Sequence, residues 1–130
     1  MLAYSHLLSG KRAVISTGAR GIGKAIALLF AHHGATVCVG GRNPNMLEKT
    51  MEEIRKISPD SKGYIADLSN KDMTEKMAKD ILDDFGGVDI IVNTVGVNRH
   101  FPAHTYDDET LESFFESNYK SGMRFMRAFT

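Results

Sequence analysis

Apolar and polar positions alternate along this chain in blocks that predict strands followed by helices. Four short runs rich in apolar and β-branched residues predict strands: 12–16, 35–40, 63–66 and 86–93. Between them, apolar residues recur at helical spacing and predict helices over 21–33, after Asn43 and after Ser69. This alternation predicts a parallel sheet with helices on both faces and right-handed crossovers.

Particular residues indicate where these helices begin and which face of each is apolar. Asn43 followed by Pro44 predicts the start of the second helix, and Ser69 with Asp72 predicts a capping box for the third. The predicted apolar stripe of the first helix consists of Ile22, Ile26, Leu29 and Phe30. That of the third helix consists of Met73, Met77, Ile81 and Phe85. The last predicted strand is apolar on both faces, as expected for a strand buried in a parallel sheet.

The final segment predicts one long helix from about Asp107 to Phe129. Its apolar stripe contains Leu111, Phe114, Phe115, Gly122, Phe125 and Met126, with the amide Asn118 among them. Because a buried amide needs hydrogen-bond partners, Asn118 is a candidate for a structural or a functional role. We expect the acidic cluster of Asp107, Asp108 and Glu109 to stabilise the helix start rather than to bind metal.

Length and charge narrow the class of protein. The 130 residues are 42% hydrophobic and fit a single domain over 1–130. Sixteen basic side chains balance sixteen acidic ones, so charge-driven binding to nucleic acid or to an anionic membrane is not expected. No run approaches the roughly 18 apolar residues of a membrane helix. With Cys38 as the single cysteine, we expect a cytoplasmic protein.

The sequence "STGARGIG", residues 16–23, lies between the first predicted strand and helix. Such a turn can hold an anion, because backbone N–H groups and the helix dipole both favour negative charge there. Glycine in a strand-to-helix turn also serves tight packing alone. The turn by itself therefore leaves phosphate binding and simple turn geometry as equal alternatives.

Four further motifs follow in order: "GGRN", "ADLS", "NTVG" and "ESNYKSG". With the glycine turn, they resemble the short-chain dehydrogenase/reductase family over about residues 10–129. The resemblance implies a Rossmann-like doubly wound parallel sheet with strand order 3-2-1-4. It also implies hydride transfer between a nicotinamide cofactor and a small-molecule carbonyl or alcohol substrate.

The resemblance, together with the charge of Arg20 and Arg42, gives the expected site residues. The cofactor-binding positions would be Thr17, Gly18, Arg20, Gly21, Ile22, Gly23, Arg42, Asp67, Leu68, Asn93, Val95 and Gly96. Among them, Gly18 to Gly23 would hold the diphosphate, Asp67 and Leu68 the adenine, and Asn93 to Gly96 the nicotinamide ribose. Asn118 would match the family's catalytic asparagine, which helps to hold a water in a proton relay.

Charge predicts which cofactor binds. NAD-binding proteins usually place an acidic residue after the second strand, where it binds the ribose 2′-hydroxyl. Here that position is Gly41, followed by Arg42, and Arg20 lies in the glycine turn. Because arginine binds phosphate in a fork geometry, we expect NADP(H), with its 2′-phosphate, to be favoured over NAD(H).

Three features depart from the family pattern. An ungapped alignment places Thr17 at the family's first glycine, where a positive φ would cost about 1–2 kcal/mol. Thr94 and Val95 replace the family's second asparagine and its alanine. The family's general base, a tyrosine four residues before a lysine, does not occur in these 130 residues. His100 and His104 flank Pro102 in a predicted loop, and we expect no metal site there.

These observations leave three hypotheses. The chain is the N-terminal half of an NADP(H)-dependent oxidoreductase, truncated before the catalytic half of the fold. Alternatively, it is a complete non-catalytic nucleotide-binding or oligomerising module. The third possibility is a decayed product without function. In the first two cases we expect a homo-oligomer, which would cover the apolar final helix.

Overall fold

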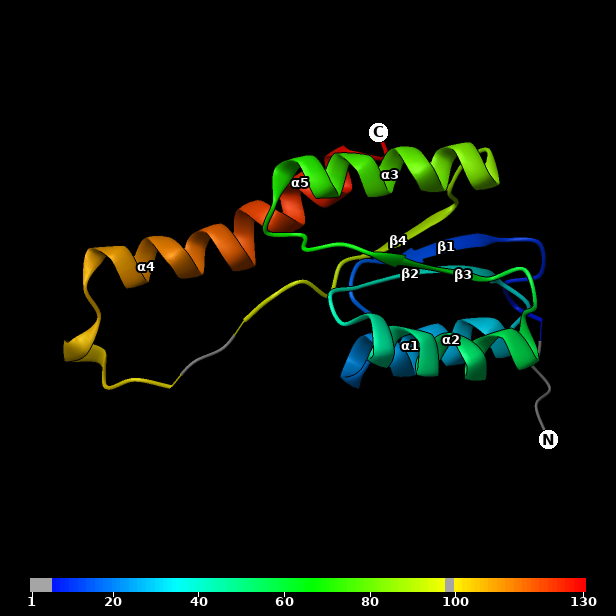
Figure 1. Ribbon diagram of the computed structural model, residues 1–130, viewed down its shortest axis with the longest axis horizontal. Helices are drawn as coiled ribbons and strands as arrows, with labels where there is room; N and C mark the ends of the chain where they lie inside the picture. Colours follow the sequence, from blue (N-terminus) through cyan, green and yellow to red (C-terminus); the bar gives the residue numbers. More distant parts are fainter. Residues whose placement is uncertain (1–5, 98–99) are drawn as a thin grey trace.

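A computed structural model describes residues 6–97 and 100–130 and contains a four-stranded parallel sheet. The strands are β1 (Arg12–Ile15), β2 (Thr36–Gly41), β3 (Lys62–Ile65) and β4 (Ile90–Val92). Their order is β3-β2-β1-β4, which confirms the predicted doubly wound arrangement (Figure 1). In the central register, Val14 lies opposite Cys38 on one side and Ile91 on the other.

Helices cover both faces of the sheet. They are α1 (Gly21–His32), α2 (Pro44–Ile57), α3 (Lys71–Phe85), α4 (Asp108–Phe115) and α5 (Ser121–Arg127), with a short 3₁₀ turn, η1 (Ala103–Thr105). α1 and α2 pack on one face, and α3 and α5 pack on the other (Figure 1). Within residues 6–97 and 100–130, no helix combines the length and the apolar character needed to cross a membrane.

The face that α1 turns toward the sheet differs from the predicted stripe. The side chains of Ile22 and Leu29 are 76% and 56% exposed, so their prediction as core residues was wrong. The buried positions are instead Gly23, Ala27 and Ala31. Small residues let the helix backbone lie close to the strands, and hydropathy alone does not reveal that requirement.

The starts of α2 and α3 are both capped by asparagine. The Asn43 side chain accepts a hydrogen bond from the Met46 amide at 3.0 Å, which confirms the predicted cap. In α3 the cap is Asn70 rather than the predicted Ser69, and it accepts from the Met73 amide. The predicted stripe of α3 is correct for the buried Met77 and Ile81, whereas Met73 itself is exposed.

The final helix is not one regular α-helix. A π-helical turn, η2 (Glu116–Lys120), joins α4 to α5. The Glu116 carbonyl accepts from the Ser121 amide, five residues on, and from the Ser121 hydroxyl at 3.0 Å. The wider turn shifts the helical phase. Phe125 in α5 is buried, whereas Leu111 and Phe115 on the predicted stripe are exposed.

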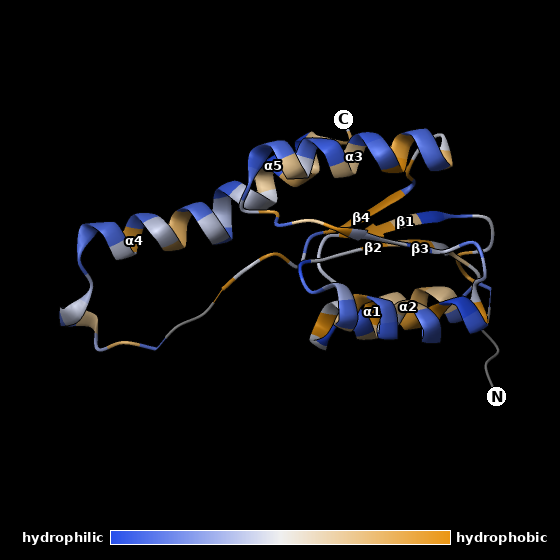
Figure 2. Ribbon diagram, viewed as in Figure 1, coloured by the Kyte–Doolittle hydropathy of each residue, from blue (hydrophilic) through white to orange (hydrophobic). Residues whose placement is uncertain are grey.

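Apolar residues are concentrated on the strands and on the helix faces that meet them (Figure 2). β4 was expected to be fully buried, but its three residues are only half-buried. In the described part of the chain, β4 pairs with β1 alone and forms an edge of the sheet. α4 extends away from the sheet and has no buried residue (Figure 1).

Candidate functional site

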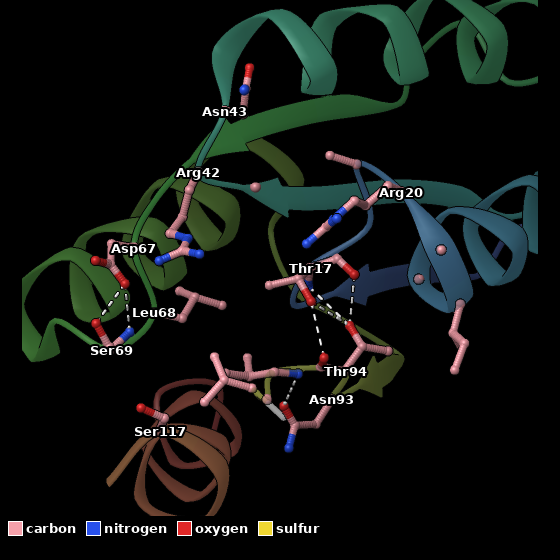
Figure 3. Close-up of a pocket in the computed structure, with 18 of the residues that line it drawn as sticks. Thr17, Arg20, Arg42, Asn43, Asp67, Leu68, Ser69, Asn93, Thr94 and Ser117 are labelled. Carbon is pink, nitrogen blue, oxygen red and sulfur yellow. Dashed lines mark hydrogen bonds between the residues drawn. The ribbon is translucent and has the colours of Figure 1, made fainter. Parts of the chain in front are cut away.

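A hollow of about 1000 Å³ lies at the carboxyl ends of the strands (Figure 3). Its walls come from the segments that follow all four strands and from α4 and η2. β2 lies on one side of β1 and β4 lies on the other. The order in which the chain adds parallel strands to the sheet therefore reverses at β1. In open α/β sheets, ligands bind in the crevice at such a switch point.

The turn between β1 and α1 forms one wall of the hollow. The Gly18 amide donates to the Gly40 carbonyl at 2.9 Å, which anchors the turn to β2. A Cβ at Gly23 would overlap the Thr17 carbonyl oxygen and lie 2.9 Å from the Gly18 Cα. Gly21 has a φ of +61°, which is a conformation that favours glycine. The glycines are therefore required by close packing and by backbone conformation.

The strain expected at Thr17 is absent. Among the described residues, His6 is the one non-glycine residue with a positive φ. Thr17 therefore occupies its position without the left-handed conformation that would penalise a β-branched side chain. The shortened turn departs from the family's spacing but remains a regular strand-to-helix connection.

The N-terminus of α1 opens onto the hollow. Arg20 is the N-cap residue, and its side chain makes no capping hydrogen bond. The first turn of α1 also contains no acidic side chain. The first N–H groups of a helix have no partner within the helix, and the helix dipole places partial positive charge there. Gly21, Ile22 and Gly23 line the hollow and thus present backbone N–H groups of the kind that can bind an anion.

Two arginines add positive charge at the rim of the hollow. Arg20 comes from the glycine turn and Arg42 from the segment after β2, and both point into the site (Figure 3). Within the part of the chain that the structure describes, neither guanidinium forms an ion pair. Both groups are exposed and can therefore bind an anionic ligand.

Asp67 lies at the same end of the hollow, after β3. Its Oδ1 accepts hydrogen bonds from the Ser69 hydroxyl at 2.6 Å and from the Ser69 amide at 3.0 Å. These two bonds, with the nearby Arg42 charge, hold the pKa of Asp67 below its ordinary value. The carboxylate is therefore ionised at neutral pH, and Oδ2 can accept a hydrogen bond from a ligand.

The segment after β4 forms the opposite wall. Asn93 Oδ1 accepts from the Val95 amide at 3.2 Å and from the Ser16 hydroxyl at 3.4 Å. Asn118 Oδ1 accepts from the Val97 amide at 2.7 Å, and its carboxamide packs directly against Gly96. Asn118 thus orients this wall of the site from η2.

Thr94, in the same segment, is bonded to the glycine turn. Its hydroxyl donates to the Thr17 carbonyl at 2.7 Å and accepts from the Thr17 amide at 3.1 Å (Figure 3). The Thr17 hydroxyl in turn donates to the Thr94 carbonyl at 3.1 Å. The two walls are therefore joined directly through side chains.

Most of the residues predicted for the site do lie together. All the predicted cofactor-binding residues line the hollow except Gly18, which is buried beneath it. Asn118 does not line the hollow, and it is exposed rather than buried as predicted. The η2 residue at the wall is Ser117, one residue earlier.

Several residues of the site were not predicted. They are Ala19, Asn43, Met46, Ser69, Val97, Ser113, Phe114 and Ser117. Ala19, Asn43, Ser69 and Ser117 lie within the quoted motifs, so their place in those motifs was the available signal. The others reach the hollow through the path of the backbone, which local sequence patterns do not specify.

Residues 11–130 match the family described as short chain dehydrogenase. The chain is 40% identical over 96 residues to an uncharacterized oxidoreductase, MT0954, of Mycobacterium tuberculosis, covering 74% of this chain and 36% of that protein. It is 34% identical over 121 residues to the 3-oxoacyl-[acyl-carrier-protein] reductase FabG of Vibrio cholerae, covering 93% and 48% respectively.

Solved structures agree with these matches. A short-chain type dehydrogenase/reductase from Mycobacterium marinum superposes with a TM-score of 0.87 at 28% identity, covering 93% of this chain and 49% of that one. The chain spans less than half the length of the curated relatives it matches. The sequence match over nearly the whole chain and the shared fold show that it belongs to the short-chain dehydrogenase family of oxidoreductases.

Proposed function

We propose that this chain forms the cofactor-binding part of an NADP(H)-dependent oxidoreductase that interconverts a carbonyl compound and an alcohol. The backbone N–H groups of Gly21 to Gly23 bind the cofactor diphosphate. Arg20 and Arg42 bind the 2′-phosphate, and Asp67 Oδ2 accepts a hydrogen bond from the adenine amino group. The wall from Asn93 to Gly96 lies beside the nicotinamide ribose.

One observation carries this proposal. The uncapped N-terminus of α1 and the two arginines face the same hollow, and neither arginine forms an ion pair among the described residues, although the Asp67 carboxylate lies near Arg42. Such an arrangement provides two anion sites, one from backbone N–H groups and one from guanidinium groups. NADP(H) carries a diphosphate and a 2′-phosphate, whereas NAD(H) carries the diphosphate alone.

The bound cofactor supplies or accepts the hydride. The chain's own residues bind it and orient it, and Asn118 holds the wall beside the nicotinamide ribose through the Val97 amide. Reduction of a carbonyl group also requires a proton donor at the carbonyl oxygen. The family's tyrosine–lysine pair does not occur in these 130 residues. Because the relatives are about twice as long, we propose that a following segment supplies this pair.

A second candidate function is a non-catalytic module that acts by nucleotide binding or by self-association. The exposed apolar side chains of α4, η2 and α5 favour it: Leu111, Phe115, Tyr119, Met123 and Met126. A contiguous exposed apolar surface of this kind marks an interaction site. We propose that a homo-oligomer covers it. A cytoplasmic location is also part of the proposal, supported by the single buried Cys38, which has no cysteine partner.

The test is a comparison of NADPH and NADH affinities for the purified chain. We expect NADPH to bind at least 10-fold more tightly, because a hydrogen bond to a charged group contributes about 1.5–3 kcal/mol. Arg42→Ala should remove most of this preference and leave NADH affinity nearly unchanged. Arg55→Ala, which removes an arginine that pairs with Glu48, is the matched control and should change neither affinity.

Equal affinities for the two cofactors, or tighter binding of NADH, would refute the assignment of Arg20 and Arg42. Sedimentation separates the two candidate functions. A monomer that binds NADPH supports the reductase part alone, whereas an oligomer without nucleotide affinity supports the second candidate.

A further inference from the structure

We propose that Thr17 and Thr94 form a hydroxyl latch that positions the glycine turn and thereby sets the affinity of the hollow for its nucleotide. The inference rests on the proposed cofactor site, and it assigns to these two side chains a role in orientation rather than in contact with the substrate.

The contacts of the latch are reciprocal. The Thr94 hydroxyl donates to the Thr17 carbonyl at 2.7 Å and accepts from the Thr17 amide at 3.1 Å. The Thr17 hydroxyl donates to the Thr94 carbonyl at 3.1 Å, and the two hydroxyl oxygens lie 2.9 Å apart. The Thr94 amide donates to the Ser16 hydroxyl at 2.7 Å. Both polar groups of the Thr17 backbone are thus bonded by one side chain.

The latch is connected to the anion site through Gly23. The Thr17 carbonyl oxygen accepts the hydrogen bond from the Thr94 hydroxyl and also lies against Gly23. A Cβ added at Gly23 would overlap this oxygen. A movement of the Thr17 peptide therefore moves the first turn of α1. Since the N–H groups of that turn form the proposed diphosphate site, the latch determines where they point.

The latch also explains why two departures from the family pattern occur together. Thr17 stands where the resemblance places a glycine, and Thr94 stands where it places an asparagine. Each change alone introduces a hydroxyl group that is only partly exposed and requires a partner. In this chain, each hydroxyl bonds the backbone of the other residue, so the two changes compensate one another.

The consequence concerns the geometry of the whole hollow. Thr17 begins the wall proposed for the diphosphate, and Thr94 lies in the wall proposed for the nicotinamide ribose. Hydrogen bonds between them fix the separation of these walls. A dinucleotide that contacts both walls would bind less tightly if this separation became variable.

The experiment compares Thr17→Val, Thr94→Val and the double variant with the unchanged chain. Valine keeps the β-branched shape and removes the hydroxyl. Ser61→Ala is the control, because it removes a buried hydroxyl that bonds the Val37 amide and Ser58, away from the hollow. Thr94→Ser keeps the hydroxyl and should restore the properties of the unchanged chain.

The first readout is amide hydrogen exchange in the chain without nucleotide. The Gly18 amide donates to Gly40, and the Ala66 amide donates to Gly41, so neither bond is removed by the substitutions. We expect Thr94→Val to speed exchange at Gly18 about 10-fold relative to Ala66, because the turn opens locally. Unchanged exchange at Gly18 relative to Ala66 would overturn the latch.

The second readout is the NADPH dissociation constant. Each single variant should raise it about 5- to 20-fold, and the double variant should raise it no further, because both substitutions remove one shared interaction. Additive effects, or an affinity unchanged by Thr94→Val, would overturn the latch while leaving the cofactor site intact. If the unchanged chain binds no NADPH, the proposed function fails, and the exchange readout still decides the latch.

Discussion

Replacing Gly23 by alanine tests the packing of the glycine turn most severely. The new Cβ would lie 2.8 Å from the Thr17 carbonyl carbon and 2.9 Å from the Gly18 Cα, and it would overlap the Thr17 oxygen. Nonbonded carbons prefer separations of about 3.5–4.0 Å, so the two carbon contacts alone require α1 and the turn to separate by roughly 0.6–1.2 Å. The overlap with the Thr17 oxygen requires a still larger movement. Overpacking of this kind costs about 1–3 kcal/mol in the free energy of unfolding.

The same displacement should disturb nucleotide binding. The N–H groups at the start of α1 would move by a distance that breaks well-directed hydrogen bonds, so we expect NADPH affinity to fall at least 10-fold, about 1.4 kcal/mol. The assays are fluorescence titration with NADPH and thermal unfolding. Gly10→Ala is the control, because a Cβ at Gly10 would have open space around it and Gly10 lies outside the hollow; it adds only the backbone strain of a φ of +74°. If Gly23→Ala binds NADPH within twofold of the unchanged chain, the reasoning is refuted.

Three further predictions concern other parts of the chain. Phe125→Ala should lower the free energy of unfolding by about 3–5 kcal/mol, because its side chain is 1% exposed; an unchanged urea midpoint would contradict this. Ser69→Ala should raise the pKa of Asp67 toward its ordinary value, as measured by NMR titration. The folded-state pKa of Asp67 is lowered, so the stability that its ionisation contributes is present at neutral pH and is lost as the pH falls through that pKa. Ser69→Ala should therefore lower the free energy of unfolding more at pH 7 than in acid, and equal losses at both would argue against this. Burial raises the pKa of the Cys38 thiol to about 12, so a thiol reagent at neutral pH should modify it only after unfolding, and rapid modification of the native chain would disagree.

The order of elements and the place of the hollow could be predicted because they depend on local signals. Apolar runs and glycine turns mark where each strand ends, and parallel topology brings those ends to one edge of the sheet. Arg42 was identified by its charge after the second predicted strand, and Asp67 and Asn93 were identified by the resemblance to the family. Their convergence follows from the fold rather than from any contact visible in the sequence.

The predictions of which residues are buried were wrong where tertiary packing outweighs hydropathy. Ile22 is apolar but exposed, because close approach of α1 to the sheet selects the small residues on another face. In the π-helical turn, the Ser121 amide and hydroxyl donate to the Glu116 carbonyl. The apolar periodicity of the sequence does not predict this turn. The same turn leaves Asn118 exposed, which a regular helical stripe did not predict. Similarly, the partnership of Thr17 and Thr94 joins residues 77 positions apart.

The central claim is that the hollow at the carboxyl ends of the strands binds NADP(H). Its most direct test is an amide chemical-shift map of the isotopically labelled chain titrated with NADP⁺. The account predicts saturable shifts concentrated at Gly21 to Gly23, Arg42, Asp67 and Leu68. A second, smaller hollow lies between β3 and α3, lined by Tyr64 among others, and its amides should not move. Shifts confined to that second hollow, or no saturable shifts, would contradict the account.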